Sequence, residues 1–180
     1  ELLLLFGDYL NEVRASRPGE RGTAVYRADW RALDRWNGPR SLTAGETVVA
    51  QVDVADPWSE REEGYRASGP AGVSFHVLDD SDKTDLFDAG RTIGAGESES
   101  IEIRLPIGGG RLVARTAALV PAKVRVTIDG RDVGALDVTP SNAWAEPWVE
   151  LPSGLRRGRI TLTPVDGGWV DYHLWIVATR

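Results

Sequence analysis

The sequence predicts an all-β fold, built as an antiparallel sandwich or barrel. Two observations support this prediction. Apolar and polar residues alternate in eight or nine short segments, and a period of two is typical of strands with one buried face. These segments recur about every 10 to 15 residues, with Gly, Pro, Asp and Asn between them, and no helix-length periodic segment separates them. A parallel α/β fold, which needs such helices, is therefore disfavoured.

The expected strands follow one another along most of the chain. The clearest is 123–129, where Val124, Val126 and Ile128 alternate with polar residues, and the Asp-Gly pair that follows predicts a tight hairpin turn. The long polar stretch 56–71 is expected to be a loop. In chain order, the strands are predicted at 47–55, 72–78, 100–105, 111–117, 123–129, 132–138, 147–151, 159–163 and 171–178.

The first part of the chain has a different pattern. Its apolar residues recur at helical spacing, which predicts a short amphipathic helix over 1–16, packed on a single sandwich domain over 17–180. A helical turn is also expected near 29–36. Because the chain begins with Glu and contains no Met, we expect it to be a fragment of a longer polypeptide. The helix prediction rests on Leu2, Leu5, Phe6, Tyr9, Leu10 and Val13.

The composition excludes several classes of function. The absence of cysteine removes disulfides, thiolate metal sites and cysteine nucleophiles. A net charge of −6 argues against nucleic acid or an anionic membrane as a partner. With two histidines in 180 residues, a histidine-rich metal site is not expected. The opening apolar run "ELLLLF" is far shorter than the roughly 20 residues of a membrane span.

The region 123–178 resembles the second half of the galactose-binding-like jelly rolls, a group that includes many carbohydrate-binding modules. The matching pieces are "IDGRDVG", "WAEPWVELPSG", "GRITLT" and "DYHLWIV". The resemblance implies a jelly-roll sandwich and, as ligand class, a carbohydrate. Two features depart from the family pattern: three residues separate the tryptophans where two are usual, and Asp171 stands where a sugar-contacting asparagine is common.

Two pairs of aromatic residues are candidate ligand contacts. Indole rings stack on the C–H faces of sugars, and nearby carboxylates and amides bind the hydroxyls. Trp144 and Trp148, with Asn142 and Glu146, form one such set, and the loop residues Trp58 and Tyr65 add to it. The alternative is that these rings fill the edge of the core. If 147–151 is a strand, Trp148 shares a face with Glu150.

A run of aspartates is a candidate calcium site. Closely spaced carboxylates in a turn supply the hard oxygen ligands that calcium prefers. The spacing does not match the twelve-residue loop of an EF-hand, and a solvated hairpin loop explains the run equally well. The candidate ligands are Asp79, Asp80, Asp82 and Asp85.

Three functions remain open at this point. The first is a non-catalytic carbohydrate-binding accessory module of an extracytoplasmic protein, periplasmic or secreted. The second is a structural or assembly domain that docks on a protein partner or on the rest of its own polypeptide. The third is a glycoside hydrolase that uses loop carboxylates such as Glu60, Glu62 and Glu63, since that reaction needs two carboxyl groups about 5 to 10 Å apart.

Overall fold

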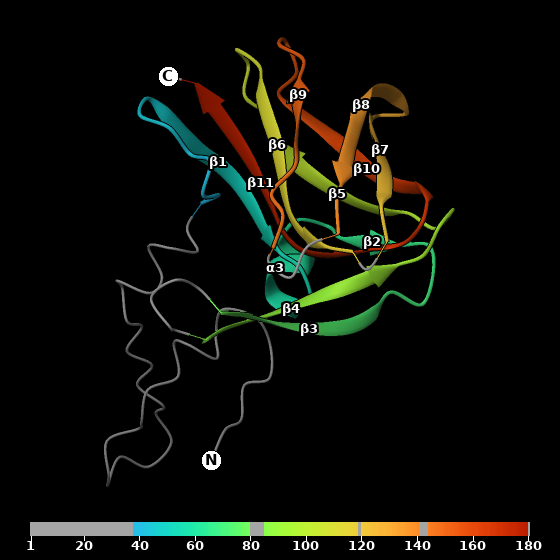
Figure 1. The fold of residues 1–180 in the computed structure, drawn as a ribbon. Coiled ribbons are helices and arrows are strands. Elements are labelled where there is room, and N and C mark those ends of the chain that lie inside the picture. The colour runs from blue at the N-terminus through green and yellow to red at the C-terminus, as the bar shows by residue number, and fades with distance from the viewer. Residues whose placement is uncertain (1–37, 80–84, 119, 141–143, 180) are drawn as a thin grey trace, which may run out of the picture.

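The computed structural model describes residues 38–79, 85–118, 120–140 and 144–179. Within these ranges the chain forms two antiparallel sheets that pack face to face (Figure 1). The predicted antiparallel β-sandwich is therefore confirmed. The helix expected over 1–16 and the turn expected near 29–36 lie outside the described residues. No helix in the described ranges is long and apolar enough to cross a membrane.

The larger sheet has the order β3-β4-β11-β6-β9, and β1 pairs with the remaining part of β11. Its strands are β1 (Glu46–Asp53), β3 (Gly72–Asp79), β4 (Asp85–Ile93), β6 (Gly110–Ala117), β9 (Trp148–Leu151) and β11 (Trp169–Thr179). The smaller sheet has the order β2-β5-β10-β7-β8. Its strands are β2 (Arg66–Ala67), β5 (Glu99–Arg104), β7 (Ala122–Ile128), β8 (Arg131–Val138) and β10 (Arg157–Asp166).

Three elements differ from the sequence prediction. The expected loop 56–71 contains a helix, α3 (Pro57–Glu62), and the short strand β2. Asp56 caps this helix by accepting hydrogen bonds from the backbone N–H groups of Trp58 and Ser59, and a proline at the first helical position suits a helix start. The third element is β4, which lies in a run of turn-favouring aspartates and pairs with β3 along its whole length.

Alternation of side chains builds the core between the sheets. In β7 the residues at even positions are buried and those at odd positions point outward, as expected from the period of a strand. The turn after β7 has positive φ angles at both Asp129 and Gly130, which is the geometry of the predicted two-residue hairpin. From the larger sheet, Leu112, Leu174 and Ile176 meet these residues in one continuous cluster.

Polar side chains are buried at one end of this core. The hydroxyl of Tyr65 donates a hydrogen bond of 2.7 Å to the carboxyl group of Glu99, and both residues are buried. Nearby, Arg91 forms a two-bond ion pair with Glu60 of α3. Burial raises the pKa of Glu99 to about 8, although the hydrogen bond from Tyr65 acts in the opposite direction. Glu99 is therefore largely protonated at neutral pH.

The raised pKa of Glu99 predicts that stability falls with rising pH. The unfolded chain releases this proton near pH 4.5 and the folded chain near 8, so the free energy of unfolding decreases as the pH rises between these values. The unfolded-state titration of His173 near its usual pKa of 6.5 acts in the opposite direction and fades above pH 7, so the loss caused by Glu99 is clearest between pH 7 and 8. There we expect a loss of about 1 kcal/mol per pH unit, measured by urea denaturation.

Two variants test whether Glu99 causes this pH dependence of stability. Glu99→Gln should flatten the slope between pH 7 and 8. The control Glu102→Gln, on the same strand, should keep it, because Arg159 lowers the pKa of the Glu102 carboxyl and its titration falls outside this window. An unchanged slope in Glu99→Gln contradicts the assignment.

Candidate functional site

The outer face of the larger sheet gathers aromatic and charged side chains. In β11, Leu174 and Ile176 face the core, so His173, Trp175 and Val177 lie on the opposite face. The strand register places Trp175 between Val113 of β6 and Gln51 of β1. It places His173 between Arg115 of β6 and Asp53 of β1.

A β-bulge changes the pattern at the start of this face. Along β6, the register of β11 shifts between Asp171 and His173, so Tyr172 is the extra residue. Its ring contacts that of Trp144, with ring centroids 6.0 Å apart. The bulge thus brings an aromatic side chain over the region between β9 and β11.

Arg115 is the centre of a buried cluster on this face. Its guanidinium lies 4.9 Å from the ring centroid of Trp144 and 4.8 Å from that of Trp175. It forms an ion pair of 2.9 Å with Glu146, and the two side chains are only 2% and 9% exposed. His173 stacks on Trp175 at 4.4 Å. Burial, assisted by the charge of Arg115, lowers the pKa of His173 well below its usual value, so this histidine is neutral.

The segment before β1 contacts this face as well. The backbone N–H of Arg40 donates to the carboxylate of Glu146, while Arg111 of β6 donates to the hydroxyl and carbonyl oxygens of Ser41. Arg111 also forms a two-bond ion pair with Glu46. Hydrogen bonding from Arg111, and then from Thr43, lowers the pKa of Glu46 to about 2.

The predicted ligand residues therefore have different environments. Trp144 and Glu146 belong to the buried cluster around Arg115, and Tyr65 is bound to Glu99 in the core. Trp148 and Trp58 are exposed, by 49% and 70% respectively, and Trp58 lies on α3. Asn142 lies outside the described residues.

Two of the four predicted calcium ligands lie outside the described residues. Asp79 and Asp85 are register partners at the end of the β3–β4 hairpin, whereas Asp80 and Asp82 lie outside the described residues. Within the part of the chain that is described, no group of three or more His, Asp or Glu side chains is arranged to hold a metal ion.

Of the loop carboxylates considered for hydrolysis, Glu60 has structural partners. Glu60 binds Arg91 and also accepts a hydrogen bond from the backbone N–H of Ala55. Burial, followed by the charge of Glu62, raises the pKa of Glu63. Glu60 therefore connects α3 to the end of β1 and to β4.

Trp148 forms an open aromatic surface at the rim of the larger sheet. It lies on the edge strand β9 opposite Val113, and the guanidinium of Arg111 is 5.8 Å from its ring centroid. Val149 and Leu151 point into the core, so Glu150 shares the outer face with Trp148, as predicted. Because Arg111 is already paired with Glu46, its charge beside the indole is balanced.

A groove of about 760 Å³ adjoins this surface where β8 and β9 approach each other. Glu150 lines the groove together with polar and apolar residues of the β7–β8 hairpin and of the loop after β9. Its volume falls within the roughly 300–1,000 Å³ of small-molecule sites. The other principal lining residues are Asp129, Arg131, Asp132, Val133 and Leu155.

Comparisons with solved structures identify this fold. Carbohydrate-binding module CBM6cm-2 from Cellvibrio mixtus lichenase 5A, solved with cellotriose, is 14% identical; the match covers 74% of this chain and 100% of that one, with a TM-score of 0.51. Another family 6 carbohydrate-binding module, solved for dissection of its binding sub-sites, is 16% identical over 73% of this chain and 94% of its own, with a TM-score of 0.51.

The chain also matches 22% of the length of a family 43 arabinoxylan arabinofuranohydrolase from Bacillus subtilis, over 52% of its own length, with 18% identity and a TM-score of 0.42. No protein-family model and no curated protein matches the sequence. The matches to the two family 6 modules, which cover 73% and 74% of this chain, identify the fold as a jelly roll. In particular, this chain has the fold of the family 6 carbohydrate-binding modules.

Sequence reasoning missed Arg111 and Arg115, which organise the outer face of the larger sheet. The predicted strand 111–117 contains a usable signal, because Arg111, Val113 and Arg115 alternate and so share one face. Their aromatic partners come from β9 and β11, and only the register of the folded sheet identifies these neighbours.

The buried ion pair predicts a stability effect for Glu146. Glu146→Gln removes the carboxylate that pairs with Arg115 and leaves a buried cation less well compensated, so we expect a loss of about 3 kcal/mol in the free energy of unfolding. The matched control is Glu150→Gln on the exposed face of β9, which should change stability by less than about 0.5 kcal/mol. Urea denaturation measures both. Equal stability of the two variants contradicts a structural role for the ion pair.

Proposed function

We propose that this domain is a non-catalytic module that binds an uncharged glycan along β9. The observation that carries the proposal is the half-exposed indole of Trp148 on the rim of a jelly roll, two residues before Glu150, which lines a groove of mixed polar and apolar side chains. A sugar ring stacks on the indole through its C–H face. Glu150, about 7 Å further along the same face of the strand, accepts hydrogen bonds from sugar hydroxyls.

The surroundings of Trp148 support an uncharged ligand. The neighbouring guanidinium of Arg111 is neutralised by Glu46 and hydrogen-bonded to Ser41, so it holds its position without offering an open cationic site. Trp144 has another role in this proposal: it is 6% exposed and packs on Arg115, which makes it part of the support beneath the binding rim.

The fold agrees with this function, since a structural neighbour was solved with cellotriose bound. Cello-oligosaccharides are therefore the first probes, followed by xylo- and laminari-oligosaccharides. An extracytoplasmic location is part of the same proposal, because polymers of such sugars lie outside the cytoplasm.

Replacing Trp148 tests the proposal. Trp148→Ala should weaken binding by about 10- to 30-fold, because a central aromatic contact supplies much of the binding free energy, while the melting temperature changes little for a half-exposed residue. Binding is measured by affinity electrophoresis on soluble glycans and by calorimetry with the oligosaccharides named above.

The matched control is Trp58→Ala, which removes an exposed indole from α3 and should leave binding unchanged. Wild-type affinity in Trp148→Ala, or no binding of any of these glycans by the parent protein, overturns the proposal.

A further inference from the structure

The outer face of the smaller sheet concentrates positive charge on an acidic protein. The whole chain has a net charge of −6, yet this one face displays five exposed arginines from four neighbouring strands. The five are Arg66, Arg104, Arg125, Arg157 and Arg159.

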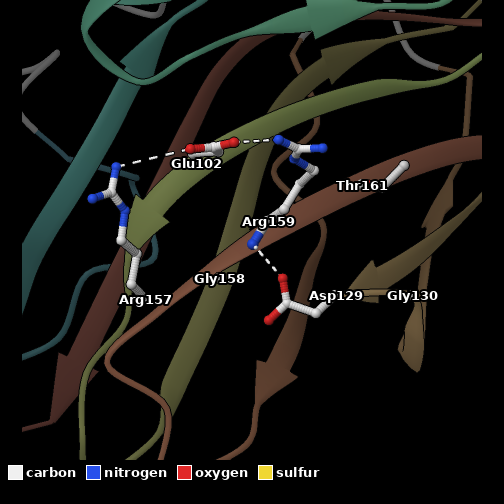
Figure 2. A pocket seen from close by; sticks show the side chains of 7 residues that line it. All are labelled: Glu102, Asp129, Gly130, Arg157, Gly158, Arg159 and Thr161. Atoms are coloured by element: carbon white, nitrogen blue, oxygen red, sulfur yellow. Dashed lines mark hydrogen bonds and ion pairs between the residues drawn. The ribbon is translucent and has the colours of Figure 1, made fainter.

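The strand register places two of these cations directly opposite each other. Arg104 of β5 is the partner of Arg157 of β10, and like charges in such a cross-strand pair are destabilising. The next pair along is Glu102 with Arg159. Glu102 forms ion pairs with both Arg157, at 3.9 Å, and Arg159 (Figure 2). The carboxylate of Glu102 is thus shared between two guanidiniums, and Asp129 is the second carboxylate of the groove that they line.

Another carboxylate near this pair belongs to Glu63. Arg104 and Arg157 both act to lower the pKa of the Glu63 carboxyl, but burial outweighs them and keeps the pKa raised. The carboxylate of Asp129 accepts a hydrogen bond from the backbone N–H of Arg159. The side chains of Arg157 and Arg159 pair with Glu102 and are nevertheless 73% and 60% exposed, so a ligand can reach their guanidiniums from solvent.

A groove of about 560 Å³ lies among these residues, and Figure 2 shows Arg157, Arg159 and Thr161 along β10 on its wall. Thr161 continues into a row of hydroxyl groups across the sheet, because its register partners are Ser100 of β5 and Thr127 of β7. The face therefore combines guanidinium groups with small side chains that both donate and accept hydrogen bonds.

We propose that this groove binds a polysaccharide that carries carboxylate groups, such as a polyuronate, through Arg157 and Arg159. A guanidinium matches a carboxylate in a two-bond geometry. The two arginines alternate on one face of β10, about 7 Å apart, and so can contact successive charged sugars. The row of hydroxyls contacts the sugar hydroxyl groups. Nucleic acid fits less well, because the rest of this acidic protein repels a dense polyanion.

This surface lies on the opposite sheet from Trp148, and the inference goes beyond the proposed function without depending on that residue. A failure of the proposed function and a failure of this inference can therefore be told apart. Trp148→Ala should keep the binding of polygalacturonate, whereas the arginine variants should keep the binding of neutral oligosaccharides.

The experiment measures binding of polygalacturonate to the full chain at low and at physiological salt. Arg157→Gln and Arg159→Gln should each weaken binding about tenfold, and added salt should weaken it further, since the contacts are exposed ion pairs. Arg61→Gln on α3 makes the same change in net charge elsewhere on the surface and should have little effect. Arg104→Gln provides a third variant on the neighbouring strand, and melting temperatures establish that all variants are folded.

The polymer itself supplies a second control. Methyl-esterified polygalacturonate has the same backbone with its carboxylates blocked, and it should bind at least tenfold more weakly. Equal binding of the esterified polymer, an effect of Arg61→Gln as large as that of Arg157→Gln, or no binding of polygalacturonate overturns the inference. Equally tight binding of dextran sulfate or single-stranded DNA also overturns it, because the surface is then a general polyanion site.

Discussion

The pairing of three strands with β11 is the constraint on which the larger sheet depends. One edge of β11 pairs with β6, and the other pairs with β4 near its start and with β1 along the rest. Since side chains alternate across a strand, this single element sends Leu174 and Ile176 into the core and Trp175 to the outer face. The bulge at Tyr172 then sets where the aromatic cluster around Arg115 forms.

Much of the fold could be predicted because alternation is a local property. The segment "KVRVTID" identifies its strand, its inward face and its hairpin turn without reference to any other part of the chain. β4 was missed because its aspartates favour turns, and pairing with β3 overrides that preference. The helix α3 was missed although Asp56 and Pro57 form a usual helix start, since its six residues are too few for a helical period.

The candidate site was less predictable, because it depends on neighbours that are distant in sequence. Trp144 and Trp148 are four residues apart and look alike in the sequence, yet one packs on Arg115 and the other remains half exposed. The difference comes from β6, whose arginines meet these rings only in the folded sheet. A buried aromatic–cation cluster thus shares one outer face with the exposed indole of Trp148, while exposed arginines gather on the other outer face.

The central claim is that glycan binding uses the rim at Trp148 and leaves the buried rings untouched. A titration of ¹⁵N-labelled protein with the tightest-binding cello-, xylo- or laminari-oligosaccharide, followed through the indole N–H resonances, tests this claim most directly. The account predicts a progressive shift of the Trp148 resonance, with those of Trp144, Trp169 and Trp175 unmoved. A stationary Trp148 resonance, or a larger shift at the buried rings, would contradict it.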